Sequence, residues 1–265
     1  MTTRTKRHRE VQRDDHTTIR YTVSGPATGT TLALVHGWGL DRSDFDAITE
    51  HLPDGVRVIA VDLAEHGESR STRTDWTIEE FGRDVVAVLE AESVDSAVVA
   101  GHSLGGAVAV EVGRQLPGEV SHIVALDSLH YLGLFPAQGP EQVEAMEDLF
   151  RRDFDAGVRG LVEGGSPVGT EEALKETYFA RMTAVRQPAG VRSMSGLVRW
   201  DMDAALGETE QPVTVFAVRE LTDPEAVERY GDRVDFVLVD LGSHHFPVEA
   251  PEGTAKLLAG VLGSA

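Results

Sequence analysis

Ser103 is the residue in this sequence whose surroundings most clearly point to chemistry. It lies in GHSLGG (Gly101–Gly106), directly after the apolar run AVVA and before a helical segment. A G-x-S-x-G turn between a strand and a helix holds its Ser in a strained backbone conformation and projects the hydroxyl from the carboxyl edge of a sheet. The pattern therefore predicts Ser103 as a nucleophile. It also places the backbone N–H of Leu104 at a helix N-terminus, where it can bind a developing oxyanion.

A second glycine-rich turn, HGWGL (His36–Leu40), follows the apolar run LALV. A turn at this place can aim a backbone N–H at the same oxyanion, and the N–H of Trp38 fits that role best. With Leu104 it would make a two-donor hole. The His36 side chain is expected to pack the turn.

A Ser at its ordinary pKa needs an imidazole to take its proton. The chain has 10 His, of which His244 and His245 are the only adjacent pair. They lie in LGSHHFP (Leu241–Pro247), after the last expected strand. Loops that follow parallel strands converge at one edge of a sheet, so this loop can reach Ser103. Of the two imidazoles, we favour His245.

Short β-rich runs alternate with helical patterns, which is typical of an α/β fold with a mostly parallel sheet and crossover helices on both faces. Residues 129–208 interrupt the alternation with helical segments and no convincing strand. We therefore expect a core domain over residues 1–128 and 209–265 and a helical cap over 129–208, inserted after the sixth strand. The expected strands are 19–23, 32–35, 56–61, 97–100, 120–126, 213–218 and 236–241.

The sequence resembles the α/β-hydrolase superfamily. Four segments occur in that family's order and spacing: HGWGL, DLAEHGES (Asp62–Ser69), GHSLGG and HFPVEAPE (His245–Glu252). The resemblance implies that Ser103 is the nucleophile, that His245 is the general base, and that Trp38 and Leu104 supply the oxyanion hole. In the family the segment that begins with Asp62 stabilises a turn, so Asp62 is not expected to be catalytic.

The third member of the triad is the point where the sequence departs from the family pattern. The usual Asp comes a few residues after the strand PVTVFAV, but Leu221 occupies that position, between Glu220 and Asp223. Asp127, at the end of the preceding strand, is also placed to hold the His tautomer and stabilise the imidazolium. We favour Asp127, and Asp223 and Glu220 remain as alternatives.

These residues predict hydrolysis of a small or medium carboxylic ester, lactone or thioester through an acyl-enzyme, with no metal and no cofactor. A cofactor-free haloperoxidase, a C–C bond hydrolase and a non-catalytic small-molecule-binding protein remain open, because one fold carries many functions. The apolar residues of the cap could line the substrate pocket or form the cap's own core.

Composition limits the partners. The 265 residues include 24 Lys and Arg against 44 Asp and Glu, a formal net charge of −20, which disfavours nucleic acid and anionic membranes. The absence of Cys excludes a disulfide framework and a thiolate nucleophile. The acidic excess with few Lys resembles proteins of a halophilic cytoplasm. Without an apolar leader at the N-terminus, we expect a cytoplasmic protein, and we expect the basic stretch at residues 4–9 to be a frayed terminus.

Overall fold

A computed structural model describes residues 4–13 and 16–263. Its centre is one eight-stranded sheet in the order β1-β2-β4-β3-β5-β6-β7-β8. β1 and β2 pair antiparallel, as do β2 and β4, and the remaining neighbours are parallel. The strands are β1 (Arg7–Gln12), β2 (Thr18–Ser24), β3 (Thr30–Val35), β4 (Val56–Val61), β5 (Ala97–His102), β6 (Val120–Leu126), β7 (Val213–Val218) and β8 (Asp235–Val239).

The strands that follow from the sequence are present, with ends that differ by up to two residues. β4, β5 and β7 are buried along their whole length, because helices cover both faces of the parallel part of the sheet. The expectation of a frayed basic N-terminus is wrong. Residues 7–12 form an edge strand on β2, and the guanidinium of Arg4 donates hydrogen bonds to the carbonyl oxygens of Val56 (2.8 Å) and Leu52 (2.9 Å).

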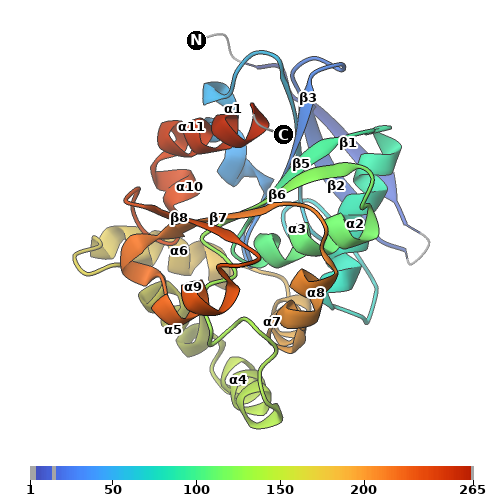
Figure 1. Ribbon diagram of the computed structural model, residues 1–265. Helices are drawn as coiled ribbons and strands as arrows, with labels where there is room; N and C mark the ends of the chain where they lie inside the picture. The colour runs from blue at the N-terminus through green and yellow to red at the C-terminus, as the bar shows by residue number, and fades with distance from the viewer. Residues whose placement is uncertain (1–3, 14–15, 264–265) are drawn as a thin grey trace.

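Two groups of helices sandwich the sheet (Figure 1). One face packs against α1 (Asp46–His51) and α11 (Pro251–Leu262), and the other against α2 (Ile78–Ala91) and α3 (Leu104–Gln115). Short helical turns complete the core: η1 (Arg42–Phe45), η2 (Arg219–Leu221), α9 (Pro224–Tyr230) and α10 (Phe246–Glu249). These layers bring the carboxyl ends of the six parallel strands to one edge of the sheet.

Five helices connect β6 to β7, and we call them the helical insertion. They are α4 (Pro140–Arg152), α5 (Phe154–Gly164), α6 (Glu172–Thr183), α7 (Ala189–Arg199) and α8 (Met202–Glu208). In Figure 1, α4, α5 and α7 lie below the sheet, at the end opposite α1 and β3. The interruption after the sixth strand is thus present. Its status as a separate cap domain over 129–208 stays a prediction.

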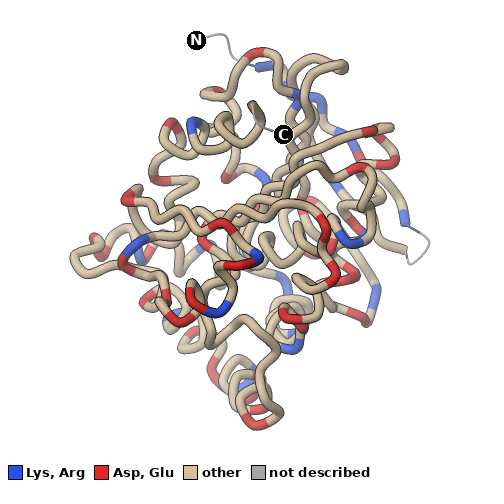
Figure 2. Tube along the Cα trace, viewed as in Figure 1, with Lys and Arg blue, Asp and Glu red and all other residues tan. Residues whose placement is uncertain are grey.

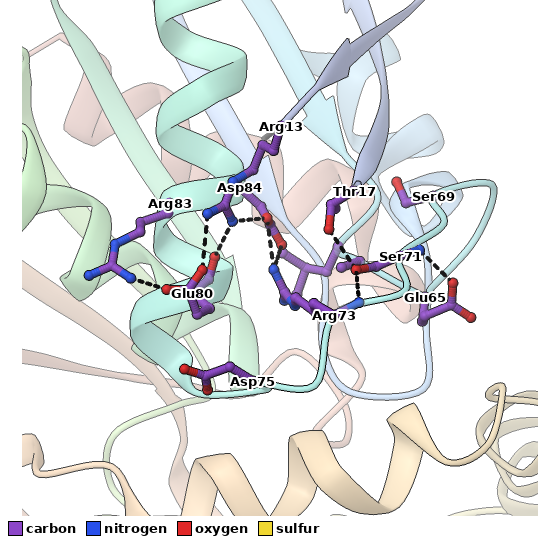
Figure 3. Close-up of polar contacts among 12 residues, drawn as sticks. Arg13, Thr17, Glu65, Ser69, Ser71, Arg73, Asp75, Glu80, Arg83 and Asp84 are labelled. Atoms are coloured by element: carbon purple, nitrogen blue, oxygen red, sulfur yellow. Dashed lines mark hydrogen bonds and ion pairs between the residues drawn. The ribbon is translucent and has the colours of Figure 1, made fainter. Parts of the chain in front are cut away.

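A buried ionic cluster attaches the β1–β2 hairpin to α2 (Figure 3). Asp84, with a side chain that is 0% exposed, accepts hydrogen bonds from the guanidinium groups of Arg73 (2.8 and 2.9 Å) and Arg13 (2.5 Å). Arg13 also binds Glu80 in the first turn of α2. Thr77 caps that helix by accepting the N–H of Glu80, as a capping box does. The cluster fixes the start of α2 against the edge of the sheet.

Acidic residues are distributed along the whole trace (Figure 2). The excess of negative charge is therefore not confined to one segment of the chain. Among the residues described, we find no helix that is long and apolar enough to cross a bilayer.

Candidate active site

Ser103 lies at the sharp turn between β5 and α3. Its backbone has φ 53° and ψ −122°, in the left-handed region that costs a non-Gly residue energy. The turn is held by hydrogen bonds from the N–H of Ser103 to the carbonyl oxygen of Leu126 (3.1 Å) and from the hydroxyl of Ser128 to that of Ser103 (2.6 Å). The strained turn that GHSLGG predicts is therefore present.

Two glycines allow this turn to form. A Cβ on Gly101 would lie 1.8 Å from the carbonyl oxygen of Gly105, and a Cβ on Gly105 would lie 2.3 Å from that of Val35. Both distances are far inside van der Waals contact, so any side chain here would push α3 away from the sheet. The glycines thus set the close helix–strand approach that lifts Ser103.

The two expected oxyanion donors belong to segments that meet at Ser103, since a Cβ on Gly37 would lie 3.1 Å from the Cβ of Ser103. Trp38 follows β3, and its buried indole donates to the carbonyl oxygen of Gly190 (2.9 Å) and to the hydroxyl of Ser193 (3.1 Å) in α7. Leu104 is the first residue of α3. Within the described residues, neither backbone N–H donates a hydrogen bond, so both amides are available to an incoming oxygen.

His36 has a structural role, as expected. Its Nε2 accepts the N–H of Leu63 (3.0 Å) and its Nδ1 lies 2.8 Å from the carbonyl oxygen of Gly37. Asp62 is likewise structural: its carboxylate accepts the N–H groups of Arg42 (2.8 Å) and Glu68 (2.7 Å). Both residues fix the loops that surround the turn of Trp38.

Asp127 directly follows β6, has a left-handed backbone conformation (φ 47°) and is completely buried. Its Oδ1 accepts the N–H of Val218 (2.7 Å) and lies 3.1 Å from Nε2 of His130. Its Oδ2 accepts the hydroxyl of Tyr131 and lies 2.7 Å from Nδ1 of His244. Burial alone would raise the pKa of Asp127, but the hydrogen bonds from His130 and His244 hold it well below its usual range. The group is therefore a buried carboxylate in contact with an imidazole.

The imidazole that contacts Asp127 is His244, whereas the sequence favours His245. The His244 side chain is 16% exposed, and its backbone N–H donates to the carbonyl oxygen of Gly165 (2.8 Å). His245 is the residue before α10, and its ring stacks on Tyr178 of α6 at 3.6 Å between centroids. Its Nδ1 is buried and has no hydrogen-bond partner within the described residues.

The two adjacent His differ because the loop has no regular structure, so successive side chains point in unrelated directions. Burial lowers the pKa of His245 well below the usual value, and the neighbouring His244 and His102 lower it further. His102 is also buried, which lowers its pKa to about 3, and its Nε2 lies 2.8 Å from the carbonyl oxygen of His244. These two rings form the packing around the pair made by His244 and Asp127.

The two alternative acids make no such contact, although Asp223 also lines the cavity beside Ser103. Asp223 caps α9 by accepting the N–H of Glu225 (2.9 Å), and Glu220 is exposed in η2. Neither makes a hydrogen bond or ion pair with an imidazole in the described part of the chain. Leu221, at the position where the family pattern has its Asp, lines the cavity beside Ser103.

That cavity has a volume of about 410 Å³, within the range of small-molecule sites. Ser103, His244 and His245 all line it. Most of the remaining wall is apolar and comes from the HGWGL turn, the segment after β6 and helices α5, α6 and α7. The helical insertion therefore contributes to the walls above the nucleophile. No cluster of three or more potential metal-binding side chains occurs in the residues that the structure describes.

Comparison with known proteins places this geometry in a family. The model of a family described as "Alpha/beta hydrolase family" matches residues 32–257. A non-heme chloroperoxidase of Streptomyces lividans is 37% identical over 121 residues, which cover 45% of this chain and 44% of that protein. A pimeloyl-[acyl-carrier protein] methyl ester esterase of Methylococcus capsulatus is 29% identical over 252 residues, which cover 89% of this chain and 96% of the esterase.

Among solved structures, a hydrolase from Pseudomonas aeruginosa PA01 has a TM-score of 0.82 at 22% identity, with 97% of this chain and 98% of the other covered. This likeness shows the shared fold. Several curated relatives are matched over part of their length only: the alignments span between 40% and 64% of four of them.

Proposed function

The chain belongs to the alpha/beta hydrolase family, and on that premise we propose that it is a serine hydrolase that cleaves small or medium carboxylic esters, lactones or thioesters through an acyl-enzyme. The observation that carries the proposal is the contact between Nδ1 of His244 and the buried Asp127 (2.7 Å) in the same cavity as Ser103. A carboxylate in this position fixes the imidazole tautomer and stabilises the imidazolium.

In the first step Nε2 of His244 takes the proton of Ser103, whose oxygen forms a bond to the substrate carbonyl carbon. The carbonyl oxygen becomes an oxyanion, held by the N–H groups of Trp38 and Leu104. Each such donor is typically worth about 2.7–4 kcal/mol of transition-state stabilisation. The bond to the leaving group then breaks, and His244 returns the proton to it. Water, activated by the same imidazole, releases the acid.

His244 replaces the favoured His245 in this proposal for a physical reason. The pKa of a base must lie near the working pH, and burial lowers that of His245 well below the usual value. His245 also has no acid at its Nδ1. The roles of Ser103, Trp38, Leu104 and Asp127 are those expected from the sequence.

The test is release of nitrophenol from short p-nitrophenyl esters, at low salt and at high salt because of the acidic composition. We expect turnover by the unmodified chain and covalent labelling of Ser103 by a fluorophosphonate, located by mass spectrometry. Ser103→Ala should remove both signals while the protein stays folded. Binding of a small molecule with neither turnover nor labelling would identify a non-catalytic member of the family instead.

A second candidate activity is formation of a peracid, supported by the similarity to the chloroperoxidase of Streptomyces lividans. Here Ser103 and acetic acid form an acetyl-enzyme with loss of water, and hydrogen peroxide then replaces water in the attack on that ester. The peracid released would oxidise bromide. The test is bromination of an indicator by the chain with peroxide and acetate, with Ser103→Ala as the control.

A further inference from the structure

The cavity beside Ser103 has two walls of different character. One wall is closed and apolar. It is formed by Trp38, Leu40, Met182, Met194 and Leu197, each of which is at most 6% exposed. Trp38 binds α7 through its indole, and α7 also carries Met194 and Leu197. This wall is therefore attached directly to the turn that carries an oxyanion donor.

The other wall is open. It includes Gly133, Gly160 and Gly164, which are all exposed, and no atom lies within 4 Å of the position that a Cβ would take on any of them. None of the three has a positive φ, so the backbone would accept other residues there. The open side of the cavity is thus lined by positions that lack side chains.

Packing explains a different glycine of α5. A Cβ on Gly157 would lie 3.1 Å from the ring of Phe150, so that residue permits the close approach of α4 and α5. Gly160 lies in the middle of the same helix, where glycine costs about 1 kcal/mol relative to alanine, yet no neighbour requires it to be small. Gly160 lines the cavity, and it contributes no side chain to that wall.

The base determines which part of an ester faces which wall. In the proposed reaction His244 returns its proton to the leaving group, so the leaving group must lie on the side of His244. The backbone N–H of His244 binds the carbonyl oxygen of Gly165, and a Cβ on Gly165 would lie 2.8 Å from that of His244. Since Gly165 directly follows Gly164, the leaving-group side is the open, glycine-lined side.

We infer that the enzyme acts on esters or thioesters that join a neutral, apolar acyl group of limited size to a large alcohol or thiol. The acyl group occupies the closed wall, and the leaving group passes out beside Gly160 and Gly164. No Lys or Arg is among the described residues that line the cavity, so nothing there compensates an acyl group that carries its own carboxylate. This inference rests on the proposed serine hydrolase activity.

Two series of esters test the unmodified enzyme. With one fixed leaving group, kcat/KM should rise about fourfold for each methylene added to acetate, as apolar burial increases. It should then fall once the acyl group exceeds the closed wall. With butyrate as the fixed acyl group, the methyl, benzyl and 4-methylumbelliferyl esters should all be turned over. The larger leaving groups should not lower kcat/KM.

Variants separate the two walls. Gly160→Leu and Gly164→Leu should lower kcat/KM for 4-methylumbelliferyl butyrate about tenfold or more relative to methyl butyrate, with Gly160→Ala intermediate. Met194→Ala should move the acyl-length optimum to longer chains and leave the preference among leaving groups unchanged. A circular dichroism spectrum and a denaturant midpoint close to those of the unmodified chain demonstrate that each variant is folded. Gly260→Leu, at an exposed helical glycine of α11 with the same free space, should change neither preference.

If the glycine variants shorten the accepted acyl chain and leave the leaving-group preference unchanged, the orientation is reversed and the inference is wrong. It is also wrong if they alter neither series. Absence of Ser103-dependent hydrolysis of every ester by the unmodified chain would instead overturn the proposed function, and the inference with it.

Discussion

Two contacts of Asp127 support the acid role that we propose for it. One oxygen accepts the N–H of Val218, which fixes the carboxylate at the sheet edge, and the other contacts His244. Asp127→Asn should lower kcat about 10⁴-fold, because the imidazole would lose its orienting anion. Steady-state kinetics on a short p-nitrophenyl ester measure the loss.

Asp223→Asn is the matched control for that variant. Asp223 lines the same cavity and caps α9, but it makes no hydrogen bond or ion pair with an imidazole among the described residues, so its replacement should leave kcat near that of the unmodified enzyme. The assignment of the acid fails if Asp223→Asn abolishes turnover and Asp127→Asn does not.

The adjacent His pair gives a second prediction. His244→Gln should lower kcat about 10²–10⁴-fold, the usual contribution of a general base. His245→Gln should have a much smaller effect on kcat, because that ring stacks on Tyr178 and has no acid partner. Steady-state kinetics of the two purified variants decide which His is the general base. An inactive His245→Gln variant and an active His244→Gln variant would support His245, the residue that the sequence favours.

How well the sequence predicts the site depends on how local each determinant is. The backbone at Ser103 follows from a glycine-rich turn of six residues, so the motif alone predicts its strain. The choice between His244 and His245 depends on side-chain directions in an irregular loop, which no periodicity encodes. The pairing of Asp127 with His244 depends on contacts between residues 117 positions apart, and the sequence could only offer Asp127 as one of three candidates.

At the scale of elements, the buried ionic cluster should matter more than the surface charge around it. Asp84→Asn should lower the free energy of unfolding by about 3–5 kcal/mol, because it leaves the guanidinium groups of Arg73 and Arg13 without their buried partner. Denaturant unfolding followed by circular dichroism gives the value.

Arg83→Ala is the comparison for Asp84→Asn, since Arg83 lies on the same helix and binds Glu80 at the surface (Figure 3). Its side chain is 57% exposed, and we expect a loss of at most about 1 kcal/mol. Equal losses for the two variants would mean that the cluster does not stabilise the fold beyond an ordinary surface ion pair.

The strands were predictable because burial on both faces produces continuous apolar runs such as VRVIAV in β4. The sequence does not predict β1, because this strand lacks such an apolar run. Its sequence, RHREVQ, is almost entirely exposed, and an edge strand made of charged residues has no apolar signal. The number of helices between β6 and β7 could not be predicted from the sequence either, because the ends of these helices depend on packing within the insertion.

For the whole molecule, burial of neutral imidazoles predicts a stability that falls with acid. Burial lowers the pKa of His36 to about 4 and those of His66 and His102 to about 3. Below about pH 6.5 the unfolded chain binds protons that the folded chain does not. Each of these His should therefore cost up to about 1.4 kcal/mol of stability per pH unit until its folded pKa is reached.

The predicted loss of stability in acid can be measured as a fall in the denaturant midpoint between pH 7.5 and pH 4.5. Asp44, Asp62 and Asp84 act in the opposite direction, because burial raises their pKa values, that of Asp44 to about 6. His122 and His245, whose pKa values burial lowers, add to the effect of the three imidazoles. The His66 ring is buried and in contact with Phe81, and His66→Phe should reduce the fall of the denaturant midpoint at low pH. A midpoint that is constant down to pH 4.5 would contradict the prediction.

The hydrogen bond from Val218 to Asp127 has a consequence for how the protein loses its activity on heating. The carboxylate that contacts His244 also links the end of β6 to the end of β7, because it accepts the N–H of Val218. A local separation of β7 from β6 would break this hydrogen bond and displace the carboxylate from His244. We therefore expect activity to be lost through local opening at a lower temperature than global unfolding. Substitutions that stabilise the contact between the ends of β6 and β7 should therefore raise the temperature at which activity is lost. Substitutions that stabilise distant helices should raise the melting temperature and leave the temperature of inactivation unchanged.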